Sequence, residues 1–257
     1  MARLLTYNVH RCLGTDGRLS PARIAEVIAA CRPDVVALQE LDVGRARSGG
    51  IDQAHAIARE LDMRHVFFNP AVRVMEEEYG DALITARPSK LVKMGPLPRH
   101  GAAESRGALW ATVQIGGVEV QVVTTHLGLR RPERLAQVDA LLGPEWLAHP
   151  ACRGPVVLLG DLNAIPRSRA YQRLAARLQD AQTHPHVRHP PKATFPSRLP
   201  LLRIDHVFVS RGVQVSRAEV VHTPLARAAS DHLPLLVEIR VDGSPAHHHP
   251  GPAAQNR

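Results

Sequence analysis

Short apolar runs alternate along the chain with segments whose apolar residues recur every three or four positions. The short runs predict buried strands and the periodic segments predict amphipathic helices, so we expect an α/β protein. The strands expected from the apolar runs cover residues 4–9, 35–38, 82–85, 109–115, 118–125, 156–159, 204–209 and 235–241.

Helix and turn signals stand between these runs. Ser20 is followed by Pro21, and a serine N-cap with proline in the first turn is a common helix start. Gly116-Gly117 separates two strand-forming runs, which predicts a hairpin. Because an antiparallel pair does not belong in a purely parallel, doubly wound sheet, the hairpin favours mixed sheets. Further helices are expected over residues 54–61 and 132–142 and after the N-cap Ser168.

The composition suits an ordinary folded protein. The chain has 257 residues, of which 44% are apolar, so we expect one domain or two tightly fused lobes. No apolar run approaches the roughly 18 residues that cross a bilayer, and residues 3–7 form a strand rather than a leader. We therefore expect no transmembrane segment and a cytoplasmic location. Cys12, Cys31 and Cys152 stand far apart, which predicts free thiols and argues against structural zinc.

The net charge of +8 and the pI near 10.2 raise the question of a polyanionic partner. The basic residues are scattered and nearly all are arginine, and alanine and proline are abundant. This bias is typical of a GC-rich genome and explains the charge without a special partner. A nucleic-acid partner stays open.

Many polar residues come at the ends of the predicted strands. A single strand-end aspartate is usually a turn former or a helix cap. So many in this position, with no run of basic residues beside them, predict one acidic pocket that binds a hard divalent cation through oxygen ligands. They are Asn8, Glu40, His126, Asp161 and Asn163, together with Asp205 in a strand and Asp231-His232 before the last strand.

Five segments, in order along the chain, resemble the motif set of the endonuclease/exonuclease/phosphatase superfamily of deoxyribonuclease-like phosphohydrolases, in its bacterial branch. They are Thr6-Tyr7-Asn8-Val9-His10, Leu38-Gln39-Glu40, Gly160-Asp161-Leu162-Asn163, Arg203-Ile204-Asp205-His206 and Ser230-Asp231-His232. Residues 79–87 and 125–127 are similar to its intermediate segments, with Asp81 where the family often has Asn. The resemblance implies an α/β (α+β) fold, a four-layer α/β/β/α sandwich of two mixed, largely antiparallel sheets with outer helices. It implies one catalytic domain over residues 1–241, with fused lobes of about 1–140 and 141–241.

The resemblance also implies Mg²⁺ or Mn²⁺ as cofactor and a role for each matching residue. Glu40 would be the principal metal ligand, helped by Asn8 and by Asp231. His232 would be the general base that takes a proton from the attacking water, and Asp205 would fix the tautomer of its ring.

Further roles follow from the same resemblance. Asp161 and Asn163 would orient the nucleophile or the phosphate, and Asp161 could also protonate the leaving group. His126 would donate a hydrogen bond to the transition state. Arg106 and Asp81 are candidate contacts to the phosphate or the substrate, although a salt bridge from Arg106 to Glu104 is an equal alternative.

Some polar residues are interpreted as structural. His10 and His206 are expected to pack rather than to catalyse, and the three glutamates at 76–78 are expected in a solvated loop. Residues 183–202 are rich in Pro and His and predict a long loop near one rim. After Val241 the composition turns to Gly, Pro and His, so we expect a flexible tail over residues 242–257.

Together these features predict a monomeric enzyme that hydrolyses a phosphodiester or phosphomonoester. Its substrate would be a lipid headgroup, a small phosphodiester or a nucleic acid. Aromatic residues make up only 4% of the chain and no Lys/Arg block lies beside the motifs, which favours a small or lipid-linked diester over duplex DNA. A DNA or RNA nuclease is the alternative. An inactive relative that binds nucleic acid or protein is another, which the intact motif residues disfavour.

Overall fold

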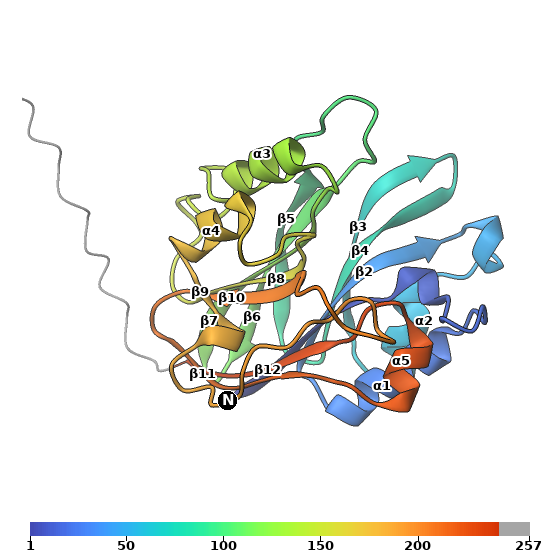
Figure 1. Cartoon of the computed structure of the whole chain (residues 1–257). Coiled ribbons are helices and arrows are strands. Elements are labelled where there is room, and N and C mark those ends of the chain that lie inside the picture. Colours follow the sequence, from blue (N-terminus) through green and yellow to red (C-terminus); the bar gives the residue numbers. More distant parts are fainter. Residues whose placement is uncertain (242–257) are drawn as a thin grey trace, which may run out of the picture.

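The computed structural model describes residues 1–241, so the tail predicted for 242–257 lies outside the described residues. Two sheets pack face to face, with α1, α2 and α5 outside the first and α3 and α4 outside the second (Figure 1). This arrangement confirms the predicted four-layer sandwich. None of the helices within residues 1–241 is long and apolar enough to cross a membrane.

Each sheet has six strands and one parallel pair, β1–β2 in the first and β7–β8 in the second. In spatial order the first sheet contains β11 (Val213–Val220), β12 (Leu235–Val241), β1 (Ala2–Asn8), β2 (Val35–Val43), β4 (Glu77–Thr85) and β3 (His65–Val74). The second contains β5 (Ser89–Pro96), β6 (Gly107–Ile115), β7 (Val118–His126), β8 (Val156–Asp161), β10 (Asp205–Val209) and β9 (Gln179–Asp180). The chain thus enters the second sheet after β4 and returns for β11. Residue 140 lies in α3, which connects β7 and β8 of the second sheet.

Two helices begin at the serine caps that the sequence predicts. The Ser20 hydroxyl accepts a hydrogen bond from the Arg23 backbone N–H, and Ser168 does the same for Tyr171. The helices are α1 (Pro21–Cys31), α2 (Gln53–Glu60), α3 (Arg131–Leu141), α4 (Arg169–Ala175) and α5 (Pro224–Ala229). Short 3₁₀ turns are η1 (His10–Cys12), η2 (Ala46–Ser48) and η3 (Ala181–Thr183).

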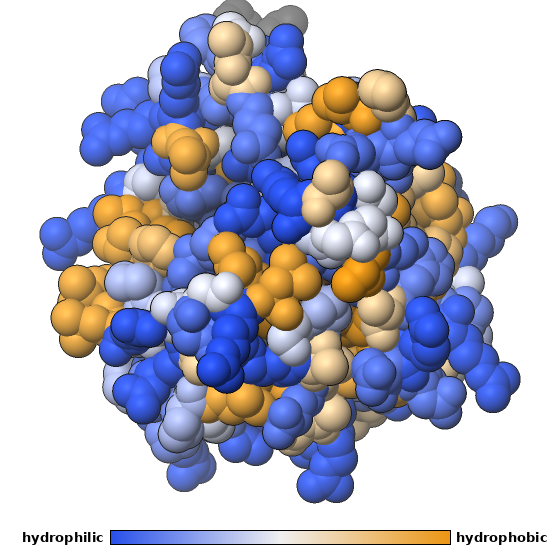
Figure 2. Space-filling view, turned by 90° about the vertical axis from the view of Figure 1, so that its right-hand side faces the viewer, coloured by the Kyte–Doolittle hydropathy of each residue, from blue (hydrophilic) through white to orange (hydrophobic). Residues whose placement is uncertain are grey.

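The second sheet is buried on both faces, as β6 shows. Leu109, Ala111 and Val113 belong to the core between the sheets, whereas Ala108 and Trp110 belong to the core under α3 and α4. Because successive strand residues point to opposite faces, one continuous apolar run fills two layers of core. The face of the molecule seen in Figure 2 is largely hydrophilic, with apolar groups in separate clusters.

Strands β3, β5, β9 and β11 and helix α5 were not predicted, and the expectation for the glutamates at 76–78 was wrong. Glu77 and Glu78 begin β4, and the chain turns before them, at Met75 and Glu76. The four missed strands lie at sheet edges, where strands are short or exposed positions interrupt the apolar run. The long loop predicted over residues 183–202 is found, with one isolated bridge between Phe195 and Leu202.

Candidate active site

Three strands of the second sheet place polar side chains in one row. His126 at the end of β7 is in register with Asp161 at the end of β8, which is in register with Asp205 at the start of β10. The residues two positions away on β8 and β10, Leu159 and Val207, belong to the core between the sheets. Side chains two residues apart share a face, so the polar row lies at the rim of that core and points toward the first sheet.

Gln39 connects the two sheets beneath this row. It lies opposite Asn8 in the β1–β2 pair and is fully buried. Its side chain accepts from the Thr6 hydroxyl at 3.3 Å and donates to the Thr124 hydroxyl of β7 at 3.4 Å. Gln39 stands in the Leu38-Gln39-Glu40 motif, but no role was predicted for it.

A β-bulge turns Glu40 out of the ladder. The β2–β4 register shifts between Leu38 and Leu41, and Glu40 has a φ of +64°. A left-handed conformation at a non-glycine residue is strained, and such strain often accompanies function. The bulge brings the half-buried Glu40 carboxylate to the polar row from the opposite sheet.

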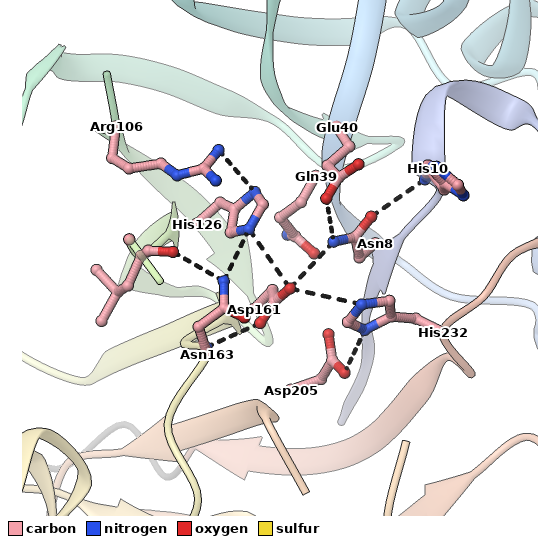
Figure 3. Close-up of polar contacts among 12 residues, drawn as sticks. Asn8, His10, Gln39, Glu40, Arg106, His126, Asp161, Asn163, Asp205 and His232 are labelled. Carbon is pink, nitrogen blue, oxygen red and sulfur yellow. Dashed lines mark hydrogen bonds and ion pairs between the residues drawn. The ribbon is translucent and has the colours of Figure 1, made fainter. Parts of the chain in front are cut away.

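Asn8 joins the carboxylates of the two sheets. Its Nδ2 donates to Glu40 Oε1 at 2.9 Å and to Asp161 Oδ2 at 3.0 Å (Figure 3). Its Oδ1 accepts from the backbone N–H of His10 at 3.1 Å. The amide nitrogen therefore faces the carboxylates, so Asn8 holds them in place, and its part as a metal ligand stays a prediction.

Asp161 lies at the centre of the cluster and is almost completely buried. Its Oδ1 accepts from the backbone N–H of Asn163, at 2.9 Å, and Asn163 adopts a left-handed φ of +47°. The Asn163 amide donates to Leu127 O at 2.9 Å and lies 3.1 Å from His126 Nε2. Burial, and then the neighbouring Asp205 carboxylate, raise the pKa of Asp161.

His232 and Asp205 form a buried pair. His232 Nδ1 lies 2.8 Å from Asp205 Oδ2, and its Nε2 lies 3.7 Å from Asp161 Oδ2. Burial lowers the pKa of His232, but the Asp205 and Asp161 carboxylates outweigh this and raise the pKa above its ordinary value. The ring of Phe195 packs against the imidazole, with 4.8 Å between the ring centroids. Nδ1 is thus fixed by Asp205, which leaves Nε2 to act in the site.

His126 and Arg106 form the opposite wall. Arg106 Nη1 donates to Glu104 at 2.8 Å and lies 3.4 Å from His126 Nδ1, so the predicted salt bridge is present while the guanidinium still lines the cavity. The Nε atom of Arg106 is buried without a hydrogen-bond partner among the described residues. Burial, then Arg106 and His232, lower the pKa of His126 well below 6.5, which keeps its ring neutral.

The remaining predicted residues lie around this centre. Asp81 is buried on β4, and burial raises the pKa of its carboxyl to about 7. Asp231 is partly exposed, and its carboxylate lies 3.6 Å from His10 Nδ1. His206 is buried between Asp180 and the carbonyl of Ala164, as expected for a packing residue.

One cavity of about 1330 Å³ opens at this centre. The predicted residues that line it are Glu40, Arg106, His126, Asp161, Asn163, Asp231 and His232. The sequence analysis did not select Tyr79, Leu129, Arg131, Arg134, Ile165, Arg167, Arg169, Phe195 or Leu202, which also line it. Few sequence features mark these residues as part of a site. Tyr79 opens a motif-like segment, and the others stand in loops or at helix starts.

The donor set suits a hard divalent cation. Glu40 and Asp231 offer carboxylate oxygens to the cavity, and ligand atoms of Asp161, Asp205 and His232 lie within 4.8 Å of one another. One oxygen of the buried Asp205, Oδ1, has no hydrogen-bond partner among the described residues. Mg²⁺ and Mn²⁺ prefer oxygen ligands. The side of the cavity lined by Glu40 and Asp231 therefore fits them better than the cluster of Asp161, Asp205 and His232, whose imidazole is already hydrogen-bonded to Asp205.

Comparisons with known proteins bear on the family and the fold. The model of the Endonuclease/Exonuclease/phosphatase family matches residues 5–232. The uncharacterized protein YbhP of Escherichia coli (strain K12) is 27% identical over 257 residues, covering 93% of this chain and 96% of that protein. A solved endonuclease/exonuclease/phosphatase from Beutenbergia cavernae is 26% identical with a TM-score of 0.77, covering 95% of this chain and 72% of that one. The mannosyl-6-phosphatase of Bacteroides thetaiotaomicron has a TM-score of 0.77 at 18% identity, covering 93% and 100% of the two chains, which shows the fold alone.

Proposed function

This chain belongs to the endonuclease/exonuclease/phosphatase family, whose members are metal-dependent phosphoesterases and nucleases, and on that basis we propose that it hydrolyses a phosphodiester or phosphomonoester with Mg²⁺ or Mn²⁺. The observation that carries the proposal is the 2.8 Å contact between His232 and Asp205. It lies beside the buried Asp161, in a cavity that Glu40 also lines.

The metal would be held on the Glu40 side of the cavity. Glu40 is the principal ligand, with Asp231 beside it and Asn8 holding the Glu40 carboxylate in place. When bound, the cation supplies positive charge that polarises the phosphoryl oxygen and offsets the charge of the breaking bond. Glu40 comes from the first sheet and Asp161 from the second, so Asn8, which bonds to both, sets their spacing.

His232 acts as the general base. Its Nδ1–H donates to Asp205, so Nε2 is the nitrogen that takes the proton of the attacking water. Because the carboxylates raise the pKa of His232, the ring must lose its Nε2 proton before it can act, and it is then a stronger base than an ordinary histidine. Asp161 is buried with a raised pKa, so it can hold a proton near neutral pH and give it to the leaving oxygen. Asn163 and the neutral His126 donate hydrogen bonds to the phosphoryl oxygens, and Arg106 adds positive charge on the same wall.

We propose a small or lipid-linked phosphodiester as substrate. The cavity wall includes Leu129, Ile165, Phe195 and Leu202, which suit a molecule with an apolar part next to the phosphate. A DNA or RNA nuclease is the second candidate, because Arg131, Arg167 and Arg169 on the same wall could follow a phosphate backbone. Because the predicted catalytic residues are all present, we disfavour the alternative of an inactive relative that only binds nucleic acid or protein.

The test is a hydrolysis screen with Mn²⁺ over short nucleic acids, phospholipids and sugar phosphates, with a chelator as the blank. We expect metal-dependent release of product from a phosphodiester. Activity on none of these classes would contradict the proposal. Gel filtration and cell fractionation would test the two further expectations, a monomer and a cytoplasmic location.

A further inference from the structure

Exposed apolar side chains line the cavity opening and continue along the loop that leads to Leu202. A single exposed leucine on a protein surface is ordinary, but several around one opening indicate an interaction site. Three of them also line the cavity that holds His232. The exposed fractions are 73% for Leu129, 42% for Ile165, 66% for Leu199, 70% for Leu201 and 43% for Leu202.

Arginines stand on the same three segments of the chain. Residues 129–131, 165–169 and 198–202, called here the rim, each combine apolar residues with arginine and contain no Asp or Glu. The arginines are Arg130, Arg131, Arg167, Arg169 and Arg198, all exposed. Within residues 1–241 none of them forms an ion pair, and Arg198 donates to a backbone carbonyl, that of Thr15. The rim therefore combines exposed apolar side chains with arginines that have no ion-pair partner within residues 1–241, and each of its three segments has residues that line the cavity.

We infer that the rim docks on the surface of a bilayer that contains anionic phospholipids, and that the substrate is a phosphodiester lipid of that bilayer. This inference rests on the proposed function and names its substrate class. Leucines that enter the headgroup region and arginines that meet lipid phosphates are the two components of interfacial binding. In the reaction, water oxygen bonds to phosphorus, one P–O ester bond breaks, and the leaving oxygen takes a proton.

The rim fits a bilayer better than a nucleic acid. Proteins that bind single-stranded nucleic acid stack its bases on aromatic rings. Proteins that bind duplex DNA contact its phosphates with basic residues and do not require exposed leucines. The rim itself has no aromatic residue; the aromatic rings that line the cavity are Tyr79, which is buried, and Phe195, which is partly buried against His232. Exposed leucines at 66% and 70%, two positions apart in Leu199-Pro200-Leu201, instead suit insertion between lipid headgroups.

Vesicle cosedimentation tests the docking. Vesicles of phosphatidylglycerol with phosphatidylcholine are compared with vesicles of phosphatidylcholine alone, using the full chain and the double variant Leu199→Ser/Leu201→Ser. We expect the parent to bind the anionic vesicles and the double variant to bind at least about tenfold more weakly, because two apolar side chains no longer leave water. The matched control is Val92→Ser/Met94→Ser on β5, whose residues are 40% and 46% exposed and do not line the cavity, and it should bind like the parent.

A second readout separates this inference from the proposed function. All variants are assayed on the soluble diester bis(p-nitrophenyl) phosphate with Mn²⁺, where the Leu199/Leu201 variant should match the parent, and on phosphatidylglycerol vesicles, where it should be at least about tenfold slower. Soluble-diester hydrolysis without vesicle binding overturns the docking and leaves the proposed function intact. Salt-sensitive binding of duplex DNA, without binding to vesicles, overturns the docking on a bilayer. A dimer seen in light scattering that the leucine substitutions dissociate would also overturn it.

Discussion

Replacing Asp205 with Asn tests the assignment of His232 as the base. The substitution keeps the size of a fully buried side chain and removes its charge 2.8 Å from His232 Nδ1. Two unit charges about 4 Å apart interact by about 4 kcal/mol at an effective dielectric constant near 20. A hydrogen bond to the neutral imidazole already contributes about 1 kcal/mol before the reaction. The difference, about 3 kcal/mol, is gained only when the ring takes the proton.

That difference predicts a fall in kcat of about 100-fold, and up to about 1000-fold if the ring also changes tautomer. KM should change little, because Asp205 does not line the cavity. The assay is steady-state hydrolysis of bis(p-nitrophenyl) phosphate with saturating Mn²⁺, with circular dichroism to show that each variant is folded.

Asp180 offers a matched control. It is also buried and lies 3.3 Å from a histidine, His206, but this pair does not line the cavity. Asp180→Asn should reduce stability and leave kcat within about threefold, because its partner does not take part in proton transfer. If folded Asp205→Asn kept kcat within the same threefold, the reasoning about the His232–Asp205 pair would be refuted.

Three further substitutions test other parts of the account. Glu40→Gln should raise the Mn²⁺ concentration for half-maximal activity about tenfold or more, and an unchanged titration would exclude Glu40 as a ligand. In chelator, the free energy of unfolding should fall with decreasing pH below about 6.5 more steeply for the parent than for His126→Gln, by up to about 1.4 kcal/mol per pH unit. The sign follows because His126 takes up a proton in the unfolded chain and resists it when folded; equal slopes in urea titrations would contradict it. Gly160→Ala would place a Cβ 1.9 Å from the carbonyl oxygen of Thr125 and should destabilise by about 3 kcal/mol or more, whereas Gly95→Ala, which meets nothing within 4 Å, should leave the melting temperature nearly unchanged.

The parts of the fold that adjacent residues determine could be predicted from the sequence. Ser20 and Ser168 cap helices through their own hydroxyls, and Gly116-Gly117 forms the β6–β7 turn with positive φ at both residues. Central strands were also predictable, because burial on both faces requires a continuous apolar run. Edge strands such as β5, with alternately half-buried and exposed residues, leave no such run.

The site was predictable where it follows from strand ends and was missed where it follows from loops. His126, Asp161 and Asp205 occupy registered positions at one edge of the second sheet, so their convergence is a consequence of strand geometry. The loop at 194–202 is placed instead by long-range backbone bonds, such as Ser197 N–H to the carbonyl of Asp231. No local sequence pattern encodes such contacts, so the position of the rim and of Phe195 at the cavity could not be predicted from the sequence.

The most direct test of the central claim is Mn²⁺-dependent hydrolysis of one phosphodiester by the parent, by His232→Gln and by His184→Gln, a buried histidine that does not line the cavity. The account predicts product release by the parent and by His184→Gln, which stops when a chelator removes the metal, and a loss of at least about 100-fold in His232→Gln. If folded His232→Gln were as active as the parent, or if the parent stayed active in chelator, the assignment of a metal-dependent site with His232 as base would be contradicted.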